Sequence, residues 1–424
     1  MTELLRIQEP SPSIGLRGAS APQRPPSVPP SWRAFFELGF RPLYLMGCFW
    51  GVIGVLLWVY APWGLTGIMG GVTWHAHEML WGFVATIATG FLLTAGSNWT
   101  GITTLQGPRL AALCALWLVA RIGFLIPGAG AFAVAALCDL AFFLGAALAL
   151  ARPIVKSRSQ RNYGVPMLLL GLCVMDALYL HAVWRVADYA LLMQRLTAGL
   201  LCMAVIALLI GRRVIPFFAS RAVAGLTISM HTRSGQWQVA AGVLAIGSLL
   251  AGWQPGLALF SAVAGVLSLW QVAAWRPWAV RRVPLLWVLY AGYAALGAGL
   301  LAAAVYALGW TVRTAWPAHV IGVGGFATLI IGMVTRTALG HLGRPLRADR
   351  SMVTAYALVI AAAVLRLMAL LPTAASLPAL HMAAAAWTVA FALYLWRFLP
   401  MMIRPRADRM PQQISGRIPV RVSR

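Results

Sequence analysis

Charged residues are scarce in this sequence, and acidic residues are scarcer still. Only 10% of the 424 residues are charged, and Asp and Glu together number 9. A typical soluble domain is about 25% charged, so this composition argues against a soluble globular protein. The five cysteines lie mostly within apolar runs and have no CxxC spacing, which argues against a disulfide scaffold and a structural zinc site.

Apolar residues dominate instead. Hydrophobic types make up 61% of the chain, and the 41 Gly and 19 Trp are typical of closely packed membrane helices and their interfaces. No segment alternates with the period of a strand, and runs able to cross roughly 30 Å of hydrocarbon recur about twelve times. The sequence therefore predicts an all-α polytopic membrane protein with approximate spans 43–62, 76–96, 109–127, 131–150, 165–185, 193–211, 237–253, 256–275, 284–308, 318–335, 352–371 and 380–399.

The two ends of the chain differ from its apolar centre. Residues 1–31 contain seven prolines and no apolar core of about 7–15 residues, which argues against a cleaved signal peptide. We expect a disordered Pro/Arg-rich cytoplasmic tail at 1–31, a single twelve-helix transmembrane domain at 32–399, and a basic cytoplasmic tail at 400–424. The basic stretch 211–236 divides the expected helices six and six, as in many transporters.

The net charge of +24 is distributed as in a membrane protein. No basic and aromatic face typical of nucleic-acid binding occurs, so we expect the lipid bilayer and no nucleic acid as partner. Cytoplasmic loops of membrane proteins accumulate Lys and Arg. With both termini in the cytoplasm, 28 of the 33 Lys and Arg residues lie in cytoplasmic segments and three in outer loops. This asymmetry predicts cytoplasmic termini and an even number of spans.

Ionisable residues within the expected spans gather in the outer half of the membrane. Each such residue is costly in lipid and is therefore a functional hypothesis. The arginines Arg121 and Arg366 and the acids Glu78 and Asp139 lie in the outer half, and Asp176 lies near the middle. Five of the seven histidines lie at the outer face, namely His75, His77, His181, His319 and His381. The sequence thus predicts a polar pocket between helices in the outer half.

Histidines and arginines in such a pocket suit haem, because imidazole ligates iron and guanidinium pairs with propionates. Imidazole clusters also suit copper. The alternatives are that single histidines at helix ends are ordinary interfacial residues, and that the intramembrane arginines are structural ion-pair partners. In particular, Arg121 and Asp139 could neutralise each other.

The densest polar motif is residues 74–83, WHAHEMLWGF. On a helix, His75 and His77 point about 200° apart, so we expect them to face different partners. Helical spacing places His75, Glu78 and Met79 on one face, and Trp81 beneath His77. The motif lacks the two histidines at i and i+4 of HExxH, which excludes a zinc metalloprotease of that type.

A second dense segment runs from residue 319 to residue 346. Its glycines at 322, 324 and 325 allow close approach of another helix or of a flat ring. His319 and His341 would be about 33 Å apart along a continuous helix, so they cannot ligate the same metal unless the chain folds back. Arg336 and Arg344 lie on the cytoplasmic side with His341, where the arginines suit anionic lipid head groups or a second site.

These segments resemble the NnrS family of bacterial inner-membrane proteins. The resemblance rests on residues 41–44 (RPLY), 74–79 (WHAHEM) with 82–83 (GF), 213–218 (RVIPFF) and 319–345. The first motif usually reads RPFF in the family, and Leu342 stands where Thr is common; neither departure changes a candidate ligand. The resemblance implies a protein that contains haem b and copper, responds to nitric oxide in denitrification, and protects against nitrosative stress.

The resemblance supports seven residues as functional candidates: His75, His77, Glu78, His319, Arg336, His341 and Arg344. The depth of the residues in the membrane adds His181 and His381. We expect His77 and His319 near the haem iron, His75 and His181 as copper ligands, and Arg121 and Arg366 at the cofactor. The expected substrate or ligand is nitric oxide or a metal–nitrosyl species.

Two other classes of function fit the same pattern. A twelve-helix proton-coupled transporter would use the outer His/Arg/Asp pocket as its substrate site. A structural or sensory partner of a respiratory complex would hold haem without turnover. A transporter would purify without a Soret band, whereas rapid consumption of nitric oxide would argue against the sensory partner.

Overall fold

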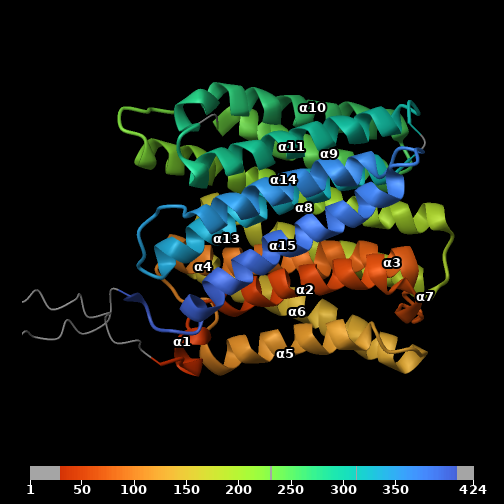
Figure 1. The fold of residues 1–424 in the computed structure, drawn as a ribbon, viewed down its shortest axis with the longest axis horizontal. Helices are drawn as coiled ribbons and strands as arrows, with labels where there is room; N and C mark the ends of the chain where they lie inside the picture. Colours follow the sequence, from red (N-terminus) through yellow and green to blue (C-terminus); the bar gives the residue numbers. More distant parts are fainter. Residues whose placement is uncertain (1–28, 230–231, 312, 408–424) are drawn as a thin grey trace, which may run out of the picture.

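The computed structural model describes residues 29–229, 232–311 and 313–407. Most of the tails expected at 1–31 and 400–424 therefore lies outside the described residues. Across the described ranges every regular element is a helix and no strand occurs, as the sequence predicts. The helices lie side by side in one elongated bundle (Figure 1).

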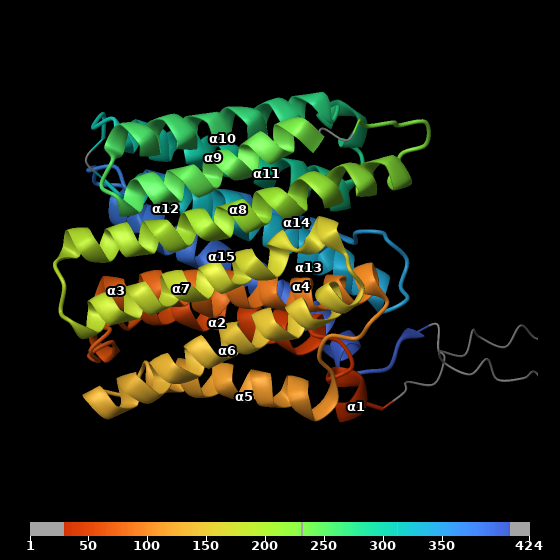
Figure 2. The same cartoon turned by 180° about the vertical axis from the view of Figure 1, so that it is seen from behind.

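The bundle is built from long helices joined by short connections. The bounds of its main elements are α1 Trp32–Phe35, α2 Phe40–Tyr60, α3 Gly71–His77, η2 Glu78–Ala85, α4 Thr86–Thr100, α5 Gly107–Gly123, α6 Ala129–Lys156, α7 Gly164–Trp184, α8 Tyr189–Ala222, α9 Thr232–Leu250, α10 Gln254–Ala274, α11 Pro284–Ala307, α12 Ala315–His319, η5 Val320–Ala327, α13 Thr328–His341, α14 Arg350–Met368 and α15 Ser376–Met402. Helices α9, α10 and α11 form one edge of the bundle, and α5 and α6 form the opposite edge (Figure 2).

The expected spans all overlap helices. Within the described residues, ten helical segments are long and apolar enough to cross a membrane, so the chain is a multi-pass membrane protein. In this count α3, η2 and α4 form one segment, and α12, η5 and α13 form another. The expected spans 109–127 and 237–253 correspond to α5, with 17 residues, and α9, with 19 residues, which fall outside the ten.

The span expected at 193–211 ends too early, because the helix extends into the first half of the basic stretch 211–236. Helix α8 continues through Pro216 to Ala222, and its 34 residues extend about 51 Å, well beyond a hydrocarbon core. Hydrogen bonds stabilise this extension: Arg213 donates to the side chain of Asn162 at 3.0 Å and to the carbonyl of Arg161 at 3.1 Å. The basic side chains here are thus carried on a helix rather than on a loop.

Two of the spanning segments change their helical geometry in the middle. An eight-residue π-helix, η2, begins directly after His77, and a second, η5, begins directly after His319. The two π-helices contact each other inside the bundle. Because π-helical turns are rare and concentrate at functional sites, both histidines stand at positions of special interest.

Both described termini lie at the same end of the bundle, which we call the terminal end (Figure 1). There the backbone N–H of Ser31 donates to the carbonyl of Ile403 at 2.8 Å. The buried Arg41 side chain donates to the carbonyls of Met402 and Arg404 at 3.0 and 2.7 Å. Helix α3 lies toward the opposite end, which we call the distal end.

Candidate functional site

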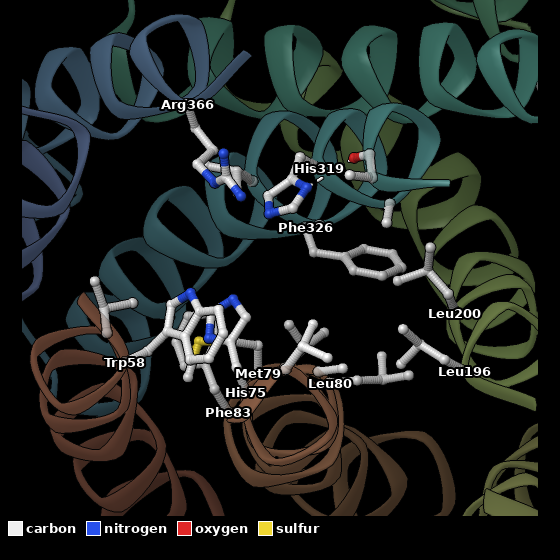
Figure 3. A pocket seen from close by; sticks show the side chains of 18 of the residues that line it. Trp58, His75, Met79, Leu80, Phe83, Leu196, Leu200, His319, Phe326 and Arg366 are labelled. Carbon is white, nitrogen blue, oxygen red and sulfur yellow. Dashed lines mark hydrogen bonds between the residues drawn. The ribbon is translucent and has the colours of Figure 1, made fainter. Parts of the chain in front are cut away.

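An apolar cavity lies in the distal half of the bundle (Figure 3). It has a volume of about 190 Å³ and is enclosed by α2, α3, η2, α8, α12, η5, α14 and α15. Two histidines and one arginine line it: His75 from α3, His319 from α12 and Arg366 from α14. Helices that are far apart in the sequence therefore bring two histidines and an arginine to the same apolar cavity.

Each of the two histidines keeps a ring nitrogen available. The Nδ1–H of His319 donates to the carbonyl of Ala315 at 2.7 Å, so its Nε2 carries the free lone pair. The His75 ring stacks on Trp58 with centroids 5.0 Å apart and planes 14° apart. Its buried Nδ1 has no hydrogen-bond partner within the described part of the chain. Both imidazoles can therefore act as ligands.

Arg366 has no acidic counterpart in the cavity. Among the described residues that line it, none is Asp or Glu. A guanidinium in apolar surroundings is costly unless an anion pairs with it. The cavity therefore suits a ligand that carries an anionic group at its edge.

Gly322 contributes space rather than packing. It lines the cavity, and a Cβ added to it would meet no atom within 4 Å. Gly325, three residues along the same π-helix, differs: its Cβ would lie 3.0 Å from the Cα of Leu296 on α11. The expected close approach of another helix is therefore confirmed at Gly325, and Gly322 borders open space in the cavity.

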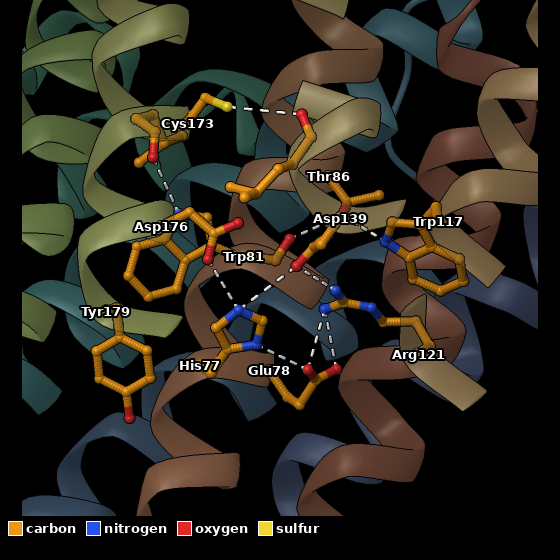
Figure 4. Close-up of polar contacts among 12 residues, drawn as sticks. His77, Glu78, Trp81, Thr86, Trp117, Arg121, Asp139, Cys173, Asp176 and Tyr179 are labelled. Atoms are coloured by element: carbon orange, nitrogen blue, oxygen red, sulfur yellow. Dashed lines mark hydrogen bonds and ion pairs between the residues drawn. The ribbon is translucent and has the colours of Figure 1, made fainter. Parts of the chain in front are cut away.

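A second polar group lies outside the cavity, in a wholly buried cluster (Figure 4). We define this buried cluster as His77, Glu78, Arg121, Asp139 and Asp176, from α3, η2, α5, α6 and α7. His77 Nδ1 lies 2.8 Å from Glu78 Oε1, and its Nε2 lies 2.9 Å from Asp176 Oδ1 and 3.4 Å from Asp139 Oδ2. All five side chains are fully buried.

Arg121 joins two of the carboxylates of the buried cluster. Its Nη1 donates to Glu78 Oε1 and Oε2 at 3.1 and 3.0 Å, and its Nη2 lies 2.5 Å from Asp139 Oδ2. The indole N–H of Trp50 donates to Glu78 Oε2 at 2.5 Å. Aromatic rings exclude water from His77, which stacks on Trp81 with centroids 5.1 Å apart.

The chain was compared with known proteins. A family model described as NnrS protein matches residues 34–406, nearly the whole chain. The chain belongs to the NnrS family. No curated protein matches it.

In this NnrS-family chain, His75 and His77 face different partners, as their angular separation predicts. Met79 lines the cavity with His75, and Trp81 packs against His77, both as expected. The expected position of Glu78 on the His75 face is wrong, because Glu78 bonds to His77 and Arg121. The reason is the π-helix that begins at Glu78, whose wider turns shift residues away from α-helical spacing.

The structure separates some residues that the sequence grouped together. His319 lies with His75 in the cavity, whereas His77 lies in the buried cluster. Arg366 lines the cavity, whereas Arg121 is held by two carboxylates. The remaining two histidines of the expected outer group are exposed and line neither site: His181 on α7, and His381, whose ring packs 5.4 Å from Tyr60.

The residues of the expected inner motif lie at the terminal end. His341 packs against Phe40 with ring centroids 5.4 Å apart and lines a separate cavity of about 240 Å³. The guanidinium of Arg336 lies 4.0 Å from the ring centroid of Phe218, and Arg344 is exposed. None of these three side chains lines the distal cavity.

Asp139 and Asp176 are visible in the sequence as intramembrane acids, but the contact between Asp176 and His77 was not predicted. The signal available was their presence in apolar spans, since acids in lipid almost always have partners. Trp58 and the two π-helices carried no signal in the sequence, because nothing in the spacing distinguishes a stacking Trp or a wider turn.

Proposed function

We propose that this protein binds haem b in the distal cavity and acts on nitric oxide or a metal–nitrosyl species. The observation that carries the proposal is the meeting of His75, His319 and Arg366 in one apolar cavity without an acid among its described lining residues. Membership of the NnrS family supports the connection with haem, copper and nitric oxide. We further propose a role in the response to nitrosative stress and in denitrification.

The residues of the cavity fit haem by their chemistry. His75 and His319 would supply imidazole nitrogens that can hold the haem iron, and Arg366 would pair with a propionate. Gly322 leaves space against which a flat ring can lie. Bound haem supplies an iron that binds nitric oxide and exchanges electrons. The apolar walls exclude water, and Trp58 restrains the His75 ring by stacking on it.

Copper is the second metal that family membership suggests. His181 is exposed and does not line the cavity, so it does not support a copper site with His75. Met79 does line the cavity, and its thioether with the two imidazoles forms a donor set that soft copper accepts. Copper in the cavity is therefore the alternative occupant, which elemental analysis separates from haem iron.

We also propose the bacterial inner membrane as the location, with twelve spans and cytoplasmic termini. In this arrangement α5 and α9 cross the membrane together with the other ten segments. The distribution of Lys and Arg supports the orientation, and the shared terminal end agrees with an even number of crossings. The distal cavity then lies in the outer half of the membrane.

The test is a reduced-minus-oxidised visible spectrum of the detergent-purified protein, with iron and copper measured on the same sample. We expect a b-type haem spectrum and at least about a tenfold loss of haem in His75→Ala and His319→Ala, because even residues behind a ligand contribute that much to metal affinity. His381→Ala is the matched control, since His381 is exposed and outside the cavity. It should keep its haem.

A folded wild-type protein without colour or metal would overturn the proposal and favour the proton-coupled transporter. If haem is present, nitric oxide titration distinguishes two remaining roles. Consumption of nitric oxide indicates turnover, whereas stoichiometric binding alone indicates a sensory partner of a respiratory complex.

A further inference from the structure

The buried cluster carries more negative than positive charge. Its three carboxylates, Glu78, Asp139 and Asp176, face one guanidinium, so the five side chains sum to two negative charges when His77 is neutral. Two carboxylate oxygens, Asp139 Oδ1 and Asp176 Oδ2, are buried without a hydrogen-bond partner in the part of the chain that the structure describes. Unbalanced charge at this depth is costly, so the cluster favours added positive charge, either protons on its own side chains or a bound metal ion.

The hydrogen bonds around His77 show where a bound metal ion would lie. Glu78 accepts from Arg121 and from the Trp50 indole, and in one tautomer of His77 it also accepts from the Nδ1–H, which leaves Nε2 unprotonated. The lone pair of His77 Nε2 then faces Asp176 and Asp139. Three acceptors converge on one point, which is favourable only with a positive charge between them.

The spacing of these acceptors matches a metal site. Two ligand atoms each about 2.1 Å from an ion lie roughly 3.0–3.4 Å apart at the angles that tetrahedral and octahedral sites use. The distances from His77 Nε2 to Asp176 Oδ1 and Asp139 Oδ2 are 2.9 and 3.4 Å. Ligand atoms of the three residues all lie within 4.8 Å of one another. A carboxylate behind the other nitrogen of a ligating histidine, as Glu78 lies here, is the usual support for such a ligand.

We propose that His77, Asp139 and Asp176 bind a divalent first-row transition-metal ion, with Glu78 positioning the imidazole. Two positive charges neutralise the cluster. One nitrogen and two carboxylates without thiolate suit Zn²⁺, Mn²⁺ or Fe²⁺. The ion would join α3 to α6 and α7 at the point where the π-helix begins. This site is separate from the distal cavity and does not depend on haem.

The experiment measures first-row metals by elemental analysis in detergent-purified wild type, Asp139→Asn and Asp176→Asn, with haem assayed in parallel. We expect about one non-haem ion other than copper per wild-type chain and at least about a tenfold loss of it in both variants, with haem retained. The matched control is Asp188→Asn, which changes an exposed acid that caps α8. It should retain the ion.

A second measurement covers the case in which the variants do not fold. Wild-type protein is treated with a chelator and titrated with Mn²⁺, and binding is followed by electron paramagnetic resonance. Saturable binding of one Mn²⁺ supports the site. Wild type that is isolated without a non-haem ion and takes up no Mn²⁺ after this treatment overturns it, and His77 is then an imidazolium in an ion-pair network.

Haem binding in the distal cavity and metal binding in the buried cluster can be disproved independently. His75→Ala and His319→Ala remove ligands from the cavity alone, so they should lose haem and keep the non-haem ion. A protein that holds this ion but no haem disproves only the proposed function. A protein that holds haem but no such ion disproves only the metal site in the buried cluster.

Discussion

Two histidines in this protein stand directly before a π-helix, yet their surroundings are opposite. His319, before η5, lines an apolar cavity, and among the described residues its Nδ1 alone has a hydrogen-bond partner, the carbonyl of Ala315. His77, before η2, is fully buried, and both of its ring nitrogens face carboxylates. The same local geometry therefore serves two purposes: one histidine can accept a large ligand, and the other organises a compact polar group.

The two arginines follow the same division. Arg121 is fully buried and contacts Glu78 and Asp139, whereas Arg366 lines a cavity with no acid among its described lining residues. A paired buried charge stabilises the fold once it is formed, and an unpaired charge prepares a site for a ligand at some cost to the empty protein. The difference can be measured, because each arginine can be replaced without changing the other site.

The largest effect on stability is expected when Arg121 is replaced. Arg121→Met leaves Glu78 and Asp139 without their cation and should lower the free energy of unfolding by about 3–5 kcal/mol. The measurement is denaturant unfolding in mixed micelles on haem-free protein. Arg366→Met is the control and should lose no stability in that state. Equal losses for the two variants would contradict the division between the sites.

An intermediate effect on stability is expected from two glycines near η5, one on α11 and one in η5 itself. Gly299 on α11 packs against η5, and a Cβ there would lie 2.9 Å from the backbone nitrogen of Ile321. Gly299→Ala should therefore cost about 1–3 kcal/mol through overpacking. Gly322→Ala, which adds a methyl group to the cavity, should change stability by no more than about 0.5 kcal/mol.

The haem content of a second variant at Gly322 tests whether the ligand lies against η5. A larger side chain at Gly322, as in Gly322→Leu, would occupy space in the cavity and should reduce bound haem at unchanged stability. The assay is the haem-to-protein ratio after purification. Unchanged haem content in Gly322→Leu would show that the ligand does not lie against this part of η5.

Much of the architecture could be predicted because it depends on composition along the chain. Each expected span overlaps a helix, since a long apolar run in lipid must satisfy its own backbone hydrogen bonds. The separation of His75 from His77 was also predictable, because it follows from the angle between residues two apart on a helix. The continuation of α8 was not, because Pro216 and the basic residues near it are typical of a helix end.

The sites could be predicted only in part, because they depend on contacts between distant helices. His75 and His319 are both visible as polar residues at one depth, but their sharing a cavity depends on how α3 and α12 pack. The pairing of His77 with Asp176 likewise depends on the approach of α7. Glu78 was misplaced because a π-helix is a local change in hydrogen bonding that the residue pattern does not encode.

The smallest effect on stability is expected at the terminal end, where the acid Asp349 is only half-buried. Burial acts to raise the pKa of Asp349, but hydrogen bonds from Ser351, Arg397 and the backbone N–H of Met352 outweigh it and lower the pKa below its usual value. A carboxyl with a lowered folded-state pKa stabilises the fold above its unfolded value of about 3.9 and loses this contribution as the pH falls through the folded-state value.

The stability of the wild type should therefore fall below about pH 4 by more than that of Asp349→Asn, which keeps a capping side chain but does not titrate. In this ion pair the Arg397 side chain is 37% exposed and the Asp349 side chain 40% exposed. The difference in stability between wild type and Asp349→Asn at neutral pH should therefore be at most about 1 kcal/mol. Thermal unfolding measured from pH 3 to pH 7 in about unit steps tests this against the pKa range of Asp. Parallel pH profiles for the two proteins would mean that the Asp349 carboxylate contributes nothing. A difference as large as that expected for Arg121→Met would contradict the contrast between buried and exposed ion pairs.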